Sequence, residues 1–583
     1  MPEDRVIPAE GTTNTVTTKI KVDGNDIPGN FEVLNVTVNK EVYRIPSAKI
    51  SILDGETSGE DFAASNEDLF IPGKELEIMA GYEANEDSIF KGIITKHGLK
   101  IRSDGTSLLR IECRDKVFKT TQIRKNRYFS EVKDSAAFEE ILGEYDFEPA
   151  IESSDLEHKE LVQYELTDWD FIVSRAEAIG KICIVDDGAF KISKPDFLQD
   201  SSLTLIYGAT LLEFDGEIDA RLQYTGVKGY SWDYANQELL EAEAEDPGIE
   251  GGGNLSASDL AGIGDESPYT LKHSGQVVQE ELQEWVNAQL LKTRLTKVRG
   301  RAKFQGYAAI KPGHLITLQG VGNRFNGPVY VSGICHEISN GEWNTHAQFG
   351  LSGEWISEKP GFMPKPAGGL TSGIPGLQIG IVTQLQEDPD GEHRILVKLP
   401  ILDPEAEGVW ARMSTLDSGD TQGFFFLPDI DSEVIVGFIN GDPRDAVVLG
   451  TLNSSAKPAP IEATDDNFEK GIVTKNELKF LLDIDKKILL LETPAGKKIT
   501  LDEDQGVLQL EDENDNKIVL DSNGILIESG SDIVLKAGGK IGGESSADIE
   551  LKAGGSFKAE GSAGAEVTTG AIAKLEGSLV QIN

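Results

Sequence analysis

Side chains that could carry out chemistry are few in this sequence, and each group has a simpler structural explanation. Asp168 and Asp170 are spaced closely enough for acid–base catalysis, but they stand where a helix is expected to begin, and acids stabilise the positive end of a helix dipole. Potential metal ligands occur at Cys335, His336 and His346, but these residues lack the sequence spacings of zinc sites. We therefore predict no catalytic residue, no metal site and no cofactor.

Acidic and glycine-rich segments in the C-terminal part of the sequence are candidates for calcium binding. Asp502-Glu503-Asp504 and the run at 511–515 lack the EF-hand pattern, so we expect solvated hairpin turns there. Ala537-Gly538-Gly539 is similar to calcium-binding nonapeptide repeats, but here the period is eight and no Asp recurs at the ligand position. No Gly-x-Ser-x-Gly nucleophile motif is convincingly placed. We expect a mechanical rather than a catalytic protein.

The segment from residue 525 onward repeats every eight residues. Two columns two residues apart are mostly apolar, which places both side chains on one face of a short strand, and a third column of small residues marks a turn. One strand per repeat cannot close a coil, because strands need lateral pairing and a coil must enclose a core. Three chains, each supplying one face of a triangular prism, can do so. The predicted trimer core consists of Ile525, Ile527, Ile533, Leu535, Ile541, Ile549, Leu551, Phe557, Val567 and Leu575.

The predicted needle has three further features. Ile518 and Leu520 step out of the eight-residue register, so we expect the shaft at 475–520 to be broader and less regular than the tip. We also expect no strand of the needle to pair completely within its own chain. Three copies of the final residues, Leu579, Val580, Ile582 and Asn583, would present a small flat apolar face.

Composition narrows the class of protein. The formal net charge of −44 over 583 residues argues against nucleic acid as a partner. Three widely separated cysteines suggest no disulfide framework and fit folding in a reducing cytoplasm. The N-terminus lacks the basic and apolar regions of a secretory signal, and no run of residues is apolar for long enough to span a membrane.

Periodicity and linker composition divide the chain. A helix is expected after Ser135 as cap, a second at 167–179 and a third at 279–297. Alternating short strands and tight turns between 380 and 453 fit a five-stranded barrel. The predicted regions are a first β-rich domain at 1–130, a mixed α/β segment at 131–235, a flexible acidic and Gly-rich insertion at 236–275, a second β domain with linker at 276–370, the barrel at 380–455 and the needle at 475–583.

Several of these segments resemble the VgrG family. The stretch from Tyr164 to Glu177 is similar to the family's acid–aromatic–acid–Phe helix entry. Residues 311–314, 320–327, His336 and 343–345 resemble strands of the family's hub and of phage tail late-control proteins. Residues 423–424, Pro428, 433–436, 441–444 and 450–453 resemble its OB-fold. The resemblance implies a mainly β fold: two β-rich hub domains with a few helices, an OB-fold barrel, and a C-terminal triple-stranded intertwined β-helix needle in a homotrimer.

The same resemblance implies a structural role and a set of partners. It points to the spike-hub protein of a contractile injection machine, whether type VI secretion system, extracellular particle or contractile phage tail. Implied partners are an inner-tube ring, baseplate proteins, a PAAR-type tip protein docking on the blunt apolar end, effector cargo, and a target membrane on firing. The protein would be made in the cytoplasm and delivered outside the cell. A phage-type tail spike or fibre that binds or degrades polysaccharide is the alternative, and a toxin-bearing spike is a further one.

Overall fold

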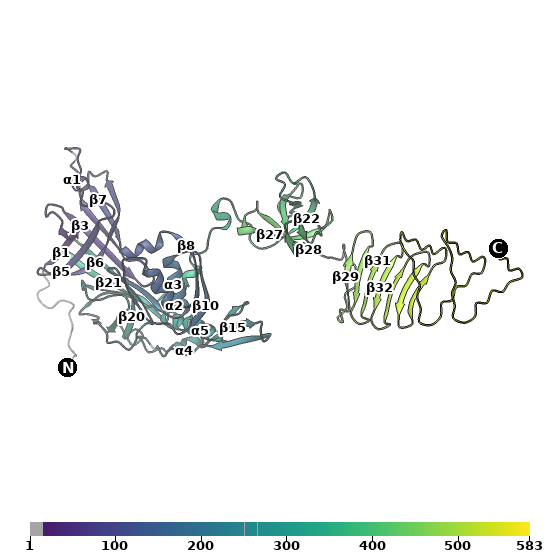
Figure 1. Cartoon of the computed structure of the whole chain (residues 1–583). Coiled ribbons are helices and arrows are strands. Elements are labelled where there is room, and N and C mark those ends of the chain that lie inside the picture. Colours follow the sequence, from purple (N-terminus) through teal and green to yellow (C-terminus); the bar gives the residue numbers. More distant parts are fainter. Residues whose placement is uncertain (1–14, 57, 250, 265, 583) are drawn as a thin grey trace. The chain divides into compact units, whose positions relative to one another are not determined.

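The computed structural model describes residues 15–56, 58–249, 251–264 and 266–582. The chain forms two compact units, which are described separately. The first comprises Met1–Gly376 with Phe438–Ala446, and the second comprises Leu377–Gly437 with Val447–Asn583. Strands dominate both units, as the alternating sequence patterns predict (Figure 1).

A large sheet organises the first unit. Alternation decides its faces: in β1, Ile20 and Val22 point into the core while Lys19 and Lys21 face outward. The strand order is β14-β18-β21-β20-β3-β4-β7-β6-β5-β1-β2, with β13 and β19 joined through β20. The strands are β1 (Val16–Val22), β2 (Asn25–Asp26), β3 (Val33–Glu41), β4 (Ser47–Leu53), β5 (Glu75–Tyr82), β6 (Asn85–Ile101), β7 (Ser107–Arg114), β13 (Leu203–Ile206), β14 (Leu211–Ile218), β18 (Val298–Gln305), β19 (Leu315–Gln319), β20 (Gly327–Ser339) and β21 (Glu342–Phe349). The short helix α1 is Ala63–Asn66.

Three longer helices lie between smaller sheets of the same unit. Helix α3 (Asp168–Ala178) begins as predicted, since the Thr167 hydroxyl accepts the N–H of Asp170 at 3.0 Å. The N-cap position of helix α2 (Asp134–Leu142) is Lys133, whose side chain makes no capping hydrogen bond, so the predicted cap at Ser135 is wrong. Ser135 lies inside the helix, is buried and exchanges hydrogen bonds with Ser154. The remaining elements here are α5 (Gln279–Leu295), β8 (Arg124–Lys133) paired with β10 (Glu157–Thr167), and the sheet of β9 (Glu148–Ile151), β11 (Ile182–Asp186) and β12 (Ala189–Ser193).

Residues 236–275 differ from the flexible insertion that their composition predicts. Strands β16 (Glu238–Glu243) and β17 (Tyr269–His273) both pair with β15 (Val227–Asp233), and α4 (Ala257–Ala261) lies between them. Gly253 serves close packing: it has φ +91°, its N–H donates to the Asn326 carbonyl at 2.8 Å, and a Cβ there would lie 2.2 Å from the Arg324 carbonyl oxygen. Low hydrophobicity is a poor guide here because backbone pairing holds β16 and β17, and the buried Ala242 of β16 packs in one cluster with Leu282 and Val286 of α5.

The second unit contains a small closed barrel and a long meander of short strands. The barrel order is β22-β23-β24-β28-β27, so the predicted five-stranded barrel is confirmed. Its strands are β22 (Gln378–Gln384), β23 (Ile395–Lys398), β24 (Val409–Met413), β27 (Glu433–Phe438) and β28 (Ala446–Thr451), with a hairpin of β25 (Ser418–Gly419) and β26 (Gln422–Gly423). The meander consists of β29 (Glu469–Val473), β30 (Lys479–Asp483), β31 (Ile488–Glu492), β32 (Lys498–Asp502), β33 (Val507–Glu511), β34 (Lys517–Asp521) and β35 (Gly524–Glu528). None of the helices in the described ranges has the length and apolar character needed to cross a bilayer.

Candidate functional site: an uncovered apolar face in residues 469–582

Strands β29 to β35 form one antiparallel sheet in which each strand pairs with the next along the chain. Because side chains alternate between the faces of a strand, the register decides which residues share a face. Ile499 on β32 lies opposite Leu491 on β31 and Leu510 on β33. The same register gives two apolar rows on one face. One row is Phe480, Leu491, Ile499, Leu510, Ile518 and Ile527, and the other is Leu482, Leu489, Leu501, Leu508, Leu520 and Ile525.

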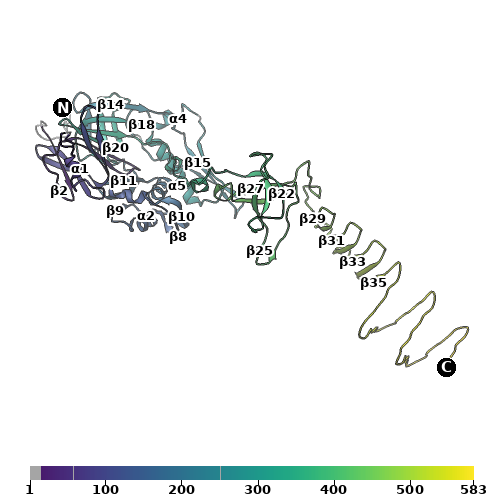
Figure 2. The same cartoon turned by 90° about the horizontal axis from the view of Figure 1, so that it is seen from above.

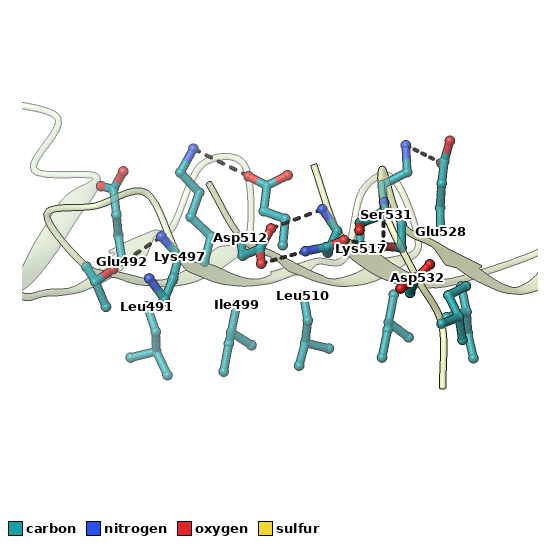
Figure 3. A pocket seen from close by; sticks show the side chains of 18 of the residues that line it. Leu491, Glu492, Lys497, Ile499, Leu510, Asp512, Lys517, Glu528, Ser531 and Asp532 are labelled. Atoms are coloured by element: carbon teal, nitrogen blue, oxygen red, sulfur yellow. Dashed lines mark hydrogen bonds and ion pairs between the residues drawn. The ribbon is translucent and has the colours of Figure 1, made fainter. Parts of the chain in front are cut away.

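This apolar face is open to water in the single chain. The exposed fractions of Leu491, Ile499 and Leu510 are 39%, 37% and 38%, although each has apolar neighbours on both sides. The face borders an open groove of about 840 Å³. Figure 3 shows Leu491, Ile499 and Leu510 pointing to one side of the sheet and Glu492, Lys497 and Lys517 to the other. A contiguous apolar surface of this kind marks an interaction site.

The opposite face carries a row of alternating charge. Lys479, Glu492, Lys498, Glu511, Lys517 and Glu528 follow one another across neighbouring strands. Three ion pairs form along the row, with N···O distances of 3.0 Å for Lys479–Glu492, 3.4 Å for Lys498–Glu511 and 2.8 Å for Lys517–Glu528. The face with the two apolar rows is therefore suited to a dry interface. The opposite face exposes the charged row, next to a middle row that includes Leu481, Leu490, Val519 and Leu526.

Two sequence-based expectations for this shaft are wrong. The shaft is regular: β29, β31 and β33 begin at 469, 488 and 507, and β30, β32 and β34 begin at 479, 498 and 517, so each set advances by 19 residues. Its strands also pair within their own chain, since β30 to β34 have intrachain neighbours on both sides. The 19-residue spacing is visible in the sequence as Lys479-Phe480, Lys498-Ile499 and Lys517-Ile518. It does not coincide with the eight-residue period of the segment from residue 525 onward.

The eight-residue columns continue the two rows of the shaft. Ile525 and Ile527 lie on β35 and end the two rows, so the columns and the rows form one surface. The ten predicted core residues are all uncovered in the single chain, with exposed fractions between 54% and 89%. They are Ile525, Ile527, Ile533, Leu535, Ile541, Ile549, Leu551, Phe557, Val567 and Leu575.

The backbone of the described residues beyond β35 is not paired with other backbone groups of its own chain. Within residues 529–582 no strand is assigned and no hydrogen bond joins two backbone groups, and the segment runs as bare loops in Figure 2. The predicted turns are present, because hydroxyls accept backbone N–H groups two residues later around the small-residue column. These contacts are Ser531 to Ser529, Ala547 to Ser545 and Ala571 to Thr569, at 3.1–3.2 Å. A β-strand needs a hydrogen-bonded neighbour, so this segment without neighbours forms the turns but no strands.

The predicted tip-docking residues are also uncovered. Leu579, Val580 and Ile582 are 81%, 49% and 83% exposed. The fourth, Asn583, lies outside the described residues.

The residues considered for chemistry are held by structural contacts. Asp168 is buried and accepts hydrogen bonds from Lys125 at 2.7 Å, Tyr145 at 2.6 Å and Gln163 at 2.9 Å. Burial opposes ionisation, but these bonds keep the pKa of Asp168 below its ordinary value. Asp170 closes the helix cap with Thr167. These contacts join α3 to β8 and β10 and leave no free acid.

The Cys/His group is likewise part of a sheet. Cys335 lies opposite His346 in the register of β20 and β21, while Nδ1 of the buried His336 lies 2.9 Å from the Thr345 hydroxyl. Burial, with Lys40 and His346 as further positive groups, lowers the pKa of His336 to about 3. Within the described parts of the chain, no group of three or more His, Cys, Asp or Glu side chains is arranged to hold a metal ion.

The acidic turns are stabilised internally. Asp512 accepts the N–H groups of Asn514 and Asn516 at 2.9 and 3.0 Å, and Glu513 pairs with Lys497 at 2.7 Å. Hydrogen bonds led by the Asn516 side chain lower the pKa of Asp512 to about 2. The carboxylates therefore serve the turns themselves.

Comparison with known proteins places the chain in a family. The Alg8 N-terminal domain model matches residues 12–340, more than half of the chain. The chain belongs to this family. Residues 378–452, which form the barrel, match the type VI secretion system/phage-baseplate injector OB domain.

Individual proteins are similar to parts of this chain, and one of them is a VgrG spike protein. The type VI secretion system spike protein VgrG1b of Pseudomonas aeruginosa is 24% identical over 58% of this chain, and the match spans 47% of that relative's length. A 43 kDa prophage tail protein from Shewanella oneidensis aligns with 57% of this chain and 98% of its own, at 11% identity and a TM-score of 0.45. An E. coli component of the type VI secretion system aligns with 74% of this chain and 100% of its own, at 13% identity and a TM-score of 0.38. In this VgrG-like chain the uncovered apolar face follows the OB barrel along the sequence.

Proposed function

We propose that this VgrG-like chain is the structural spike-hub of a contractile injection machine and acts as a homotrimer. One observation carries the proposal: residues 469–582 present a continuous apolar face, and in the described residues beyond β35 no hydrogen bond joins two backbone groups. The apolar face must be covered, and the backbone groups need hydrogen-bond partners. Both requirements are met if three copies wrap around a shared axis, with the apolar rows inside and strands of different chains paired side by side.

Such a needle suits axial load. In an intertwined prism no sheet edge is free, so force is spread over the hydrogen bonds of three chains. Burial of each Leu or Ile contributes roughly 1.5–3 kcal/mol, repeated in every layer of three chains. Unfolding should consequently be slow.

The partners in this proposal follow from the role. The first unit would meet an inner-tube ring and baseplate proteins, and the needle would carry a PAAR-type tip protein on the exposed Leu579, Val580 and Ile582. Effector cargo and contact with a target membrane on firing belong to the same proposal, as does synthesis in the cytoplasm followed by delivery outside the cell. The relative in Pseudomonas aeruginosa is a type VI secretion spike protein, which supports this class of machine.

The test is the mass and stability of the full chain. Light scattering on a sizing column should give three times the mass of one chain, and the trimer should resist SDS without heating. The double variant Ile533→Asp/Leu551→Asp should lose SDS resistance because it places six carboxylates in the core. Glu550→Gln, between the two columns, is the matched control and should keep the resistance. A monomeric wild-type chain contradicts the proposal.

A further inference from the structure

The interior of the OB barrel is filled by its own side chains. Val382, Val434, Val436 and Val448 point inward and are fully buried. A Cβ on Gly380 would lie 2.4 Å from a methyl group of Val397, so even one more carbon would not fit beside it. In a closed barrel the alternate residues point outward, and on a surface facing water they are expected to be polar.

One outer side of the barrel is apolar instead. Ile379 on β22 lies opposite Ile435 on β27, and Leu449 lies on the neighbouring β28. Gly437 lies between the side chains of Leu377 and Leu449: a Cβ on this glycine would be 3.4 Å from a methyl group of Leu377 and 3.6 Å from a methyl group of Leu449. Leu377, Ile379 and Leu449 are 56%, 44% and 50% exposed. These residues, Leu377, Ile379, Ile435 and Leu449, form the barrel patch.

A second apolar surface lies on the β25–β26 hairpin, which projects from the barrel in Figure 2. Phe424, Phe425 and Phe426 are 50%, 83% and 60% exposed, and Leu416 is 88% exposed. The hairpin holds them in place, since the Phe424 N–H donates to the Asp417 carbonyl at 3.0 Å and the Thr415 hydroxyl donates to the Phe424 carbonyl at 3.1 Å. These four residues form the hairpin patch. Exposed aromatic side chains on an ordered loop are typical anchors of protein interfaces.

We propose that the hairpin patch of one copy packs on the barrel patch of the next copy, so that three barrels form a closed ring. This inference rests on the trimer of the proposed function. Two different patches on one small domain make a head-to-tail contact, which closes into a ring when the rotation allows it. A second copy is the occupant because residues 452–468 alone connect the barrel to the needle, a reach of at most about 60 Å. The needle therefore holds three barrels at an effective concentration of roughly millimolar.

Crosslinking of the full chain tests the contact. The double variant Phe425→Cys/Leu449→Cys is treated with a short bismaleimide and separated under denaturing conditions. We expect covalent dimers and trimers at about tenfold the yield of the control pair Phe425→Cys/Arg412→Cys, because Arg412 is an exposed residue of β24 that lies outside the barrel patch. Single-cysteine variants measure the background from the native cysteines, of which Cys113 and Cys183 are buried and Cys335 is half-buried.

The outcomes separate this inference from the proposed function. Crosslinks within one chain overturn it, because the hairpin then covers its own barrel. A trimer by light scattering without crosslinks above control also overturns it and leaves the needle intact. If light scattering shows a monomer, the result contradicts both the proposed trimer and this inference.

Discussion

Lys479 on β30 lies directly opposite Glu492 on β31, with Nζ 3.0 Å from Oε2. The same pairing recurs one 19-residue step later at Lys498 and Glu511, and again at Lys517 with Glu528. Each lysine is followed, and each glutamate is preceded, by a residue of the apolar face, so the same short sequence motifs determine both faces of the shaft. The charged row fixes the register, since a slip by one residue would bring lysines against apolar side chains.

Reversing one charge in this row should weaken the needle by a salt-dependent amount. Glu511→Lys would place three lysines in succession across β32, β33 and β34. The native pairs are partly exposed, so each contributes only about 0.2–1 kcal/mol, and like charges opposite one another cost a similar amount. We expect faster loss of the SDS-resistant trimer on heating, measured as a half-life, with partial recovery in high salt. Glu511→Gln should have a smaller effect, and a loss unchanged by salt would contradict the electrostatic explanation.

Two adjacent residues of β32 should respond oppositely to the same substitution. Ile499→Asp puts a carboxylate on the apolar face, whereas Thr500→Asp puts it on the charged face. A buried charge without a partner costs several kcal/mol, and three chains would each bear it. Light scattering and SDS resistance should report loss of the trimer for the first variant only. If both variants behave alike, the assignment of faces is wrong.

Sequence patterns with short periods were sufficient for much of this fold. The eight-residue columns located the surface that includes Ile533 and Leu551, and turn residues located the closed barrel. The helix start at Thr167 followed from capping chemistry, which is local. The 19-residue repeat was missed because each half is a different strand, so identical positions recur only after a complete hairpin.

The features that the sequence patterns did not predict depend on contacts between segments that are distant in the chain. Serine is a residue type that favours helix N-caps, yet the Ser135 hydroxyl accepts the N–H of Ser154 instead. That contact depends on how two segments of the chain pack together. Gly253 lies in a segment that reads as flexible, yet Arg324 and Asn326 surround it. Partners of this kind lie far away in sequence and leave no local signal.

A methyl group at Gly253 should loosen the first unit. In Gly253→Ala the new Cβ would approach the Arg324 carbonyl oxygen within 2.2 Å at a positive φ, so the loop must move. We expect a cost of roughly 1–3 kcal/mol, seen as a lower melting temperature and faster proteolysis within 246–256. Gly248→Ala is the control: Gly248 also has a positive φ of 67°, but no atom lies within 4 Å of its Cβ. Equal effects of the two variants would show that backbone strain, not the contact with Arg324, is responsible.

Protonation of His336 should destabilise the first unit in acid. Burial and the nearby positive groups lower the folded-state pKa of this imidazole to about 3, while the unfolded value is near 6.5. Between these values the unfolded chain binds one proton more, so stability is complete above pH 6.5 and falls as the pH drops towards 3, by up to about 1.4 kcal/mol per pH unit. His336→Asn lacks this proton and should show a flatter dependence of melting temperature on pH between 6.5 and 4, although it starts from lower stability. His273→Asn, which changes an exposed histidine on β17, should leave the slope unchanged. A slope for His336→Asn equal to that of the wild type would mean that other groups carry the acid sensitivity.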